Sequence, residues 1–166
     1  MPIARHKITP CLWFDKEAED AARFYVSVFK NSRIGRISRY SEVGHEIHGG
    51  TPGAVLAIEF ELDGQPFSGL NGGPIFKFSE AVSFQVPCDT QEEIDYHWTR
   101  LQEGGGSGGN CGWLTDRFGL SWQVFPAALL DMLIDADRQK ADRAMAAMLK
   151  MNKLDLAALQ RAFDGK

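Results

Sequence analysis

The chain has 166 residues and a mass of 18.4 kDa, with 44% hydrophobic and 24% charged residues, which excludes a disordered or collagen-like protein. A net charge of -4 and a pI near 5.5 disfavour a nucleic-acid partner held through its phosphates. Mean hydropathy is -0.24, and neither a membrane span nor a secretory leader is apparent. The chain has an odd number of cysteines at wide spacing: Cys11, Cys88 and Cys111. A cytoplasmic protein without membrane contacts or disulfides is therefore predicted.

The first half of the chain predicts a strand, a helix and three further strands. A strand at residues 8–14 precedes an amphipathic helix, and Asp15 is expected to accept a hydrogen bond from the N–H groups at the helix start. The apolar side chains of this helix recur at helical spacing: Ala18, Ala21, Ala22, Tyr25, Val28 and Phe29. Strands are predicted at 33–40, 54–62 and 65–70, the last two joined by the turn dipeptide Asp63-Gly64.

The second half repeats this order. A strand at 82–88 leads into a helix that opens with the capping-box pattern Thr90-Gln91-Glu92-Glu93, and strands follow at 112–116 and 120–125. Asp15 and Asp89 lie 74 residues apart, as do Glu19 and Glu93, and Phe24 and Trp98. This spacing indicates a duplicated unit. The fold class predicted is α+β, with two βαβββ modules at about 7–78 and 80–126 that form a curved mixed sheet.

Residues 127–166 are predicted to form a helical tail after Pro126, which suits a first helical position. One helix carries the apolar stripe Ala141, Ala144, Met145, Met148 and Leu149, and Asp155 is expected to cap a last helix with Leu156, Leu159 and Phe163. These apolar faces need a covering surface. The tail's own module and a neighbouring subunit are both possible, and a homodimer with the tail at its interface is favoured.

The motifs along the chain are Ile8-Thr9-Pro10 with Leu12-Trp13-Phe14, Asn71-Gly72-Gly73-Pro74, Cys111-Gly112-Trp113-Leu114, Ser121-Trp122-Gln123 and, in the tail, Met148-Leu149-Lys150-Met151. In these the chain resembles the vicinal oxygen chelate superfamily, also called the glyoxalase/bleomycin-resistance/dioxygenase fold. Within it, the chain is similar to the PhnB-like group, often labelled 3-demethylubiquinone-9 3-methyltransferase domain proteins. The resemblance extends over essentially the whole chain.

The resemblance implies metal-ligand positions at Thr9 or Pro10, at Asn71, at Ala81 or Ser83, and at Gln123. None of these is a histidine or a carboxylate, and neutral amides and hydroxyls are poor ligands for Zn, Ni or Fe. We therefore expect neither the superfamily's usual metal nor another cofactor. A metal-dependent lyase, isomerase or dioxygenase of the same superfamily is the alternative.

Three other features have two interpretations each. His45 and His48 lie among glutamates, where they suit a metal ion, but a polar surface loop is favoured. The glycine run 104–109 lacks the Lys-Ser/Thr ending of a phosphate-binding loop and is interpreted as a flexible connection. Cys88 precedes a helix start that would lower its pKa, or it is a small buried residue.

Aromatic, amide and hydroxyl side chains on the strands are predicted to bind a small, partly apolar organic molecule in the sheet cavity: Trp13, Asn71, Ser83, Gln85, Trp113, Trp122 and Gln123. For any one tryptophan, a place in the core is an equal alternative. No catalytic residue is identified, and whether the protein is an enzyme stays open. The family label implies a quinone methyltransferase, but the turn Phe14-Asp15-Lys16-Glu17 has no glycine for S-adenosylmethionine.

Overall fold

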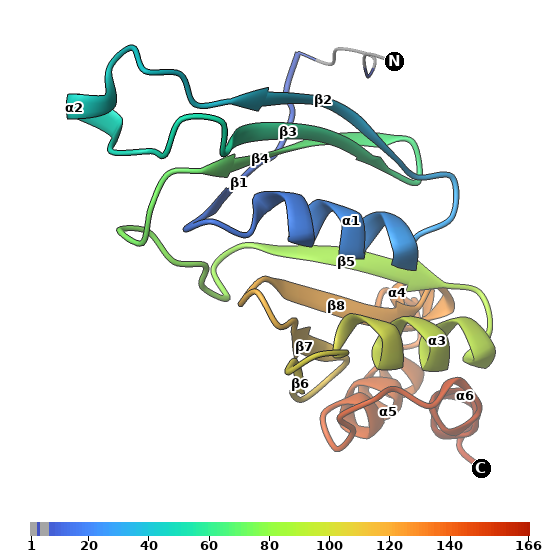
Figure 1. Ribbon diagram of the computed structural model, residues 1–166. Coiled ribbons are helices and arrows are strands. Elements are labelled where there is room, and N and C mark those ends of the chain that lie inside the picture. The colour runs from blue at the N-terminus through green and yellow to red at the C-terminus, as the bar shows by residue number, and fades with distance from the viewer. Residues whose placement is uncertain (1–2, 4–6) are drawn as a thin grey trace. The chain divides into compact units, whose positions relative to one another are not determined.

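The computed structural model describes residue 3 and residues 7–166. It divides into two compact units, unit 1 (Met1–Phe78) and unit 2 (Ser79–Lys166). Each unit contains a strand, a helix and three strands in that order, and each has its own four-stranded mixed sheet (Figure 1). The predicted α+β fold with two repeated βαβββ modules is therefore confirmed. Among the described residues, no helix is both long and apolar enough to span a bilayer.

Unit 1 contains β1 (Cys11–Phe14), α1 (Ala18–Val28), β2 (Arg33–Arg39), β3 (Val55–Leu62) and β4 (Gln65–Asn71). The strand order is β1-β4-β3-β2, with β1 parallel to β4 and the other pairs antiparallel. A single turn of helix, α2 (His45–His48), lies in the connection between β2 and β3. The sequence did not predict this turn, because four residues are too few to show a helical period.

The core of unit 1 lies between α1 and one face of its sheet. The helix buries the apolar positions that the sequence predicted, and Tyr25, Ile58 and Phe60 are almost completely inaccessible to solvent. Gly69 of β4 lets the helix approach closely, because a Cβ atom built there would lie 3.3 Å from the Cβ of Ala18. Burial of these side chains removes apolar area from water and so stabilises the unit.

Asn71, at the end of β4, caps α1. Its Oδ1 accepts a hydrogen bond from the backbone N–H of Ala18 at 2.9 Å, and its Nδ2 donates to the carbonyl of Val55 at 3.0 Å. The residue at the cap position, Glu17, makes no side-chain cap. The expectation that Asp15 would cap this helix is wrong, because a side chain from 53 residues along the chain satisfies the N–H group instead.

Unit 2 contains β5 (Ser83–Cys88), α3 (Gln91–Leu101), β6 (Ser107–Gly108), β7 (Trp113–Thr115) and β8 (Ser121–Pro126), with the strand order β5-β8-β7-β6. Thr90 caps α3 as predicted, accepting from the N–H of Glu93 at 3.2 Å. The interpretation of the glycine run as a flexible connection is wrong for β6. Ser107 pairs with Thr115, and a side chain at Gly106 would collide with the carbonyl of Thr115.

Three helices follow β8 in unit 2: α4 (Ala128–Leu133), α5 (Arg138–Met148) and α6 (Leu156–Asp164). They surround a core made of Phe125, Leu129, Met132, Ala144, Leu154 and Leu159. Ala141 and Ala144 of the predicted stripe are buried, whereas Met145 is 39% and Leu149 is 62% exposed. The apolar surface on which the dimer argument rested is thus covered within unit 2 only in part.

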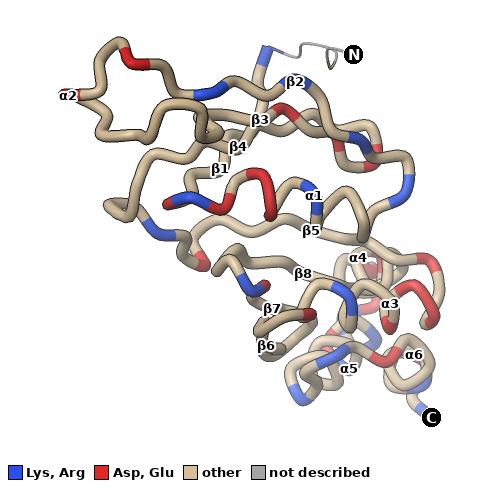
Figure 2. The backbone as a smooth tube through the Cα atoms, viewed as in Figure 1, with Lys and Arg blue, Asp and Glu red and all other residues tan. Residues whose placement is uncertain are grey.

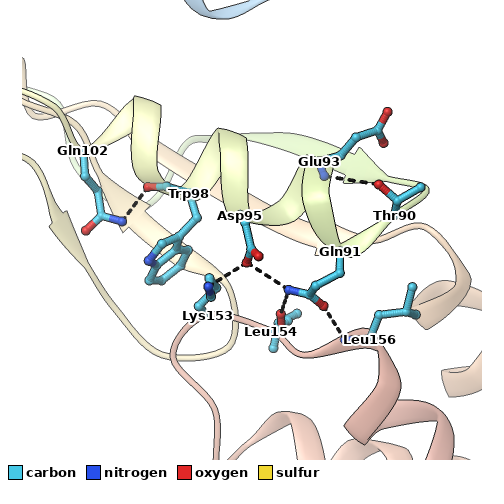
Figure 3. Close-up of polar contacts among 9 residues, drawn as sticks. All are labelled: Thr90, Gln91, Glu93, Asp95, Trp98, Gln102, Lys153, Leu154 and Leu156. Atoms are coloured by element: carbon cyan, nitrogen blue, oxygen red, sulfur yellow. Dashed lines mark hydrogen bonds and ion pairs between the residues drawn. The ribbon is translucent and has the colours of Figure 1, made fainter.

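The side chain of Gln91, in the first turn of α3, forms hydrogen bonds with the backbone of the segment that leads into α6 (Figure 3). Its Nε2 donates to the carbonyl of Leu154 at 3.2 Å, and its Oε1 accepts from the N–H of Leu156 at 2.8 Å. Beside it, Lys153 and Asp95 form an ion pair at 2.6 Å. A single amide therefore satisfies a donor and an acceptor of the tail backbone.

Gln91→Ala is expected to destabilise unit 2 by roughly 1–3 kcal/mol, because two backbone hydrogen bonds are lost and the Leu154 carbonyl and the Leu156 N–H lose their partner. Gln102→Ala is the matched control, since Gln102 donates only to Trp98 in its own helix, at 2.7 Å. Urea unfolding followed by circular dichroism measures both changes. Equal stability of the two variants would contradict the role given to Gln91.

Candidate functional site

Unit 2 has a polar sheet face on the side away from α3. Successive strand residues alternate between faces, and Val86, Trp122 and Val124 are buried with Ile94 and Leu101 of α3. The other face bears two rows of side chains aligned by strand pairing. The hydroxyl row consists of Ser83, Ser121 and Thr115, and the amide row of Gln85, Gln123 and Trp113.

Hydrogen bonds connect the two rows. The Nε2 of Gln123 donates to the Oγ of Ser83 at 2.8 Å, and the Nε2 of Gln85 approaches the Oε1 of Gln123 at 3.5 Å. Within the described residues, the Oε1 of Gln85 and the indole N–H of Trp113 have no partner. Trp113 is half-buried and Gln85 is exposed. An acceptor on β5 and a donor with an aromatic ring on β7 are therefore available to a ligand on either side of Gln123.

Four of the seven predicted ligand-binding residues, Ser83, Gln85, Trp113 and Gln123, meet on this face. Trp122 is 3% exposed and lies on the opposite face, where its indole N–H donates to Asp116 at 2.9 Å. It therefore fills the core of unit 2, which was the alternative foreseen for it.

The two remaining predicted residues belong to unit 1, and their polar groups are used there. Asn71 is 7% exposed and caps α1. The indole N–H of Trp13 donates to the carbonyl of Gly73 at 2.8 Å, and its ring contacts the Phe76 ring edge-on at 4.9 Å. The segment after β4 thus folds over Trp13, and Gly72 is required because a Cβ there would overlap the indole ring.

The metal-ligand positions implied by the resemblance are divided between the two units. Thr9 and Pro10 precede β1, and Ala81 precedes β5. Only Ser83 and Gln123 lie on the polar face of unit 2. Across the part of the chain that the structure describes, no group of three or more His, Cys, Asp or Glu residues is placed to hold a metal ion.

The two histidines of α2 bind the loop backbone. The Nδ1 of His45 lies 3.1 Å from the Gly50 carbonyl, and the Nε2 of His48 lies 3.1 Å from the Val43 carbonyl. The Nδ1 of His48 accepts the N–H of Gly50 at 2.9 Å. These contacts favour the interpretation as a polar surface loop.

A second polar surface, which the sequence did not predict, lies on the sheet of unit 1. It is an open hollow of about 420 Å³, and Arg36, Ser38, Ala57, Glu59 and Ser68 are among its lining residues. A bulge in β2 places Gly35 and Arg36 opposite the single residue Glu59, since Ile34 pairs with Phe60 and Ile37 with Ile58. A prediction that assumes regular alternation of side chains along β2 does not place Arg36 opposite Glu59, because the bulge adds one residue.

Arg36 and Glu59 form a two-point ion pair in the hollow. The Nε of Arg36 donates to one carboxylate oxygen at 2.9 Å and its Nη2 donates to the other. The hydrogen bonds from Arg36 hold the pKa of Glu59 below its usual range, so the carboxylate is charged. Arg33 pairs with Glu61 on the same two strands at 3.2 Å, and Figure 2 shows the basic residues of β2 beside the acidic ones of β3.

Residues 6–125 match the model of a family described as 3-demethylubiquinone-9 3-methyltransferase. A PhnB protein from Bacillus cereus is 37% identical, with a TM-score of 0.63, over 72% of this chain and 99% of that one. The family match covers both modules and ends at Phe125, so the helices after β8 lie outside it. The resemblance expected for Met148–Met151 therefore gains no support from the family model.

Two more distant structures share the fold alone. Protein PA1353 from Pseudomonas aeruginosa is 16% identical with a TM-score of 0.57, over 74% of this chain and 98% of its own. The fosfomycin resistance protein FosX from Mesorhizobium loti is 11% identical with a TM-score of 0.51, over 75% of this chain and 93% of its own. Among curated proteins, none matches the chain.

Cys88 is 1% exposed. Desolvation, followed by the charges of Glu93 and Asp89, raises the pKa of its thiol to about 12. The interpretation of Cys88 as a thiolate activated by the helix start is therefore wrong, because burial and two carboxylates outweigh the helix dipole. The small buried residue foreseen as the alternative is what the structure contains.

Cys88 is accordingly expected to stay unmodified by a thiol-specific disulfide reagent at pH 8, where roughly one thiol in ten thousand is ionised at such a pKa. Labelling should become fast only when the protein is unfolded in urea. Mass mapping of the labelled peptides measures the rate, and the exposed Cys11 serves as the internal control. Rapid labelling of Cys88 in folded protein would contradict the assignment.

Proposed function

The chain belongs to the 3-demethylubiquinone-9 3-methyltransferase family of PhnB-like proteins in the vicinal oxygen chelate superfamily, and we propose that it binds a small, partly apolar organic molecule on the polar face of unit 2. The observation that supports this proposal best is the alignment of the hydroxyl row with the amide row and Trp113. A ring with several oxygen substituents would stack on Trp113 and exchange hydrogen bonds with the amides.

The proposed ligand is neutral, because the two rows carry no charged side chain. Gln123 already donates to Ser83 and accepts from Gln85, so its orientation is fixed before a ligand arrives. The unpartnered Oε1 of Gln85 would accept from a ligand hydroxyl, and the indole N–H of Trp113 would donate to a ligand oxygen. Such preorganised groups cost little ordering entropy on binding.

Binding is proposed to need no metal ion. The residues at the positions implied by the superfamily do not fit one, because the hydroxyl of Ser83 and the amide of Gln123 are neutral, weak donors toward transition metals. Their hydrogen bond to each other at 2.8 Å also engages the Ser83 hydroxyl oxygen that a metal would require. A metal-dependent enzyme of this superfamily is therefore the less favoured alternative.

Methyl transfer, which the family description names, is not the proposed activity. S-adenosylmethionine usually binds at a glycine-rich turn of a doubly wound parallel sheet. Each sheet here has one parallel and two antiparallel strand pairs. The description still suggests a ligand class to test, since a substituted quinone has a flat ring and several oxygen atoms.

The probe is 2,3-dimethoxy-5-methyl-1,4-benzoquinone, titrated by calorimetry into a Cys11→Ser variant, because an exposed thiol adds to quinones. Gln123→Ala and Trp113→Leu are each expected to weaken binding by about tenfold, through the loss of a hydrogen bond or of ring stacking. Gln102→Ala, which alters an amide at the C-cap of α3, is the control and should bind unchanged.

Two results would oppose the proposal. Equal affinity in all four proteins would place the probe elsewhere. About one equivalent of Zn, Ni, Fe or Mn per purified chain, lost in the Gln123→Ala variant, would show a metal site instead. Native mass spectrometry of freshly purified protein, without added probe, tests independently for a co-purifying organic molecule.

A homodimer is also proposed, as the sequence favoured, but the tail is not required to drive it. The helices after β8 already have a core within unit 2, to which Leu129, Met132, Ala144 and Leu159 belong. The dimer interface therefore needs other surfaces, and light scattering should give about twice 18.4 kDa. A monomer mass at micromolar concentrations would refute it.

A further inference from the structure

The hollow on unit 1 has the chemistry of a binding site, and its lining residues all belong to unit 1. Its charged pair stands on neighbouring strands, and the side chains of Arg36 and Glu59 are 51% and 32% exposed. Solvent screens such a pair, so it contributes little to folding stability. Fold stability therefore does not account for the bulge that brings Arg36 opposite Glu59.

The chain itself shows what Glu59 accepts besides Arg36. The backbone N–H of Ile3 donates to the Glu59 carboxylate and helps to lower its pKa. The side chain of Ile3, which is 7% exposed, lies against Gly35, where a Cβ would be only 2.8 Å from it. An amide N–H and a small apolar group are thus already bound at the rim of the hollow.

Donors for an anion are available in the same hollow. Arg36 donates hydrogen bonds to Glu59 through its Nε and Nη2, while its Nη1 has no partner among the described residues. The hydroxyl of Ser68 is likewise without a partner among those residues, and it lines the hollow together with Ala57. A guanidinium group with spare N–H groups is well suited to a carboxylate.

We propose that this hollow binds a small zwitterion of the α-amino acid class, with its ammonium group on Glu59, its carboxylate on Arg36 and Ser68, and a short apolar side chain against Ala57. The paired charges favour a zwitterion over a simple anion, because Glu59 repels a lone carboxylate. They also favour it over a simple amine, because Arg36 repels a lone ammonium group.

The probe is L-valine, titrated into ¹⁵N-labelled wild-type protein and followed by amide chemical shifts. Saturable shifts are expected at Gly35, Ser38, Ala57 and Ser68. The analogues that lack one charge, 3-methylbutanoate and 2-methylpropylamine, are expected to bind at least about tenfold more weakly. Because this comparison uses the unaltered protein, it does not depend on a variant that folds.

Glu59→Gln and Arg36→Gln are each expected to lower the affinity for L-valine by about tenfold or more. Glu61→Gln and Arg33→Gln alter the neighbouring pair, which does not line the hollow, and should bind within about twofold of wild type. The shifts should leave Trp113 and Gln123 unaffected, which separates this site from the quinone site on unit 2.

Three outcomes would overturn the inference. The first is that L-valine causes no saturable shift at tens of millimolar. The second is that the two singly charged analogues bind as tightly as L-valine. The third is that Glu61→Gln loses as much affinity for L-valine as Glu59→Gln does. Failure of the quinone titration on unit 2 would leave this inference untouched, since the two experiments monitor different residues.

Discussion

The proposed face of unit 2 depends on one buried carboxylate. Asp116 is 3% exposed and lies in the turn between β7 and β8. Its Oδ1 accepts from the N–H groups of Phe118 and Leu120 at 2.8 and 3.1 Å, and its Oδ2 accepts from the indole of Trp122 at 2.9 Å. A buried carboxylate is tolerated only when it is hydrogen-bonded in this way, so the turn has little freedom to shift.

That turn fixes the register of the two strands, and the register fixes the site. With the turn held, Trp113 lies opposite Gln123 and Thr115 opposite Ser121. A slip of one residue would move every side chain to the other face. It would send Gln123 into the core and bring Trp122 to the surface. The hydrogen bond from Trp122 to Asp116 and the burial of Trp122 and Val124 support the register that leaves the amide row on the face away from α3.

Much of the fold was predictable, because it is encoded locally. The helix at Ala18–Val28, the capped start at Thr90 and the turn at Asp63-Gly64 follow from spacing and turn chemistry within a few residues. The cap of α1 was not predictable, since Asn71 reaches Ala18 from a distant strand. The strand β6 was also missed, because Ser107 and Gly108 have no apolar alternation and depend on pairing with β7.

The candidate site was predictable to the extent that strand alternation held. Ser83, Gln85 and Gln123 were placed on one face because β5 and β8 are regular and parallel. Trp122 and Asn71 lie instead on the helix side of their sheets, where both are buried and hydrogen-bonded to Asp116 and Ala18 respectively. Arg36 and Glu59 were missed because the bulge in β2 breaks the alternation.

The duplicated modules present different side chains at equivalent positions of their sheets. Cys11 and Gln85 are 74 residues apart, as are the equivalent aspartates, and each pairs with the last strand of its own module, at Ser68 and Gln123 respectively. In unit 2 both partners are neutral amides, which donate and accept hydrogen bonds. In unit 1 the partners are a thiol and a hydroxyl, and the charged groups stand one and two strands further along, at Glu59 and Arg36. The same backbone geometry therefore presents different chemistry in its two copies. Unit 2 offers neutral amides, which suit a neutral ligand, and unit 1 offers a charged pair, which suits a zwitterion.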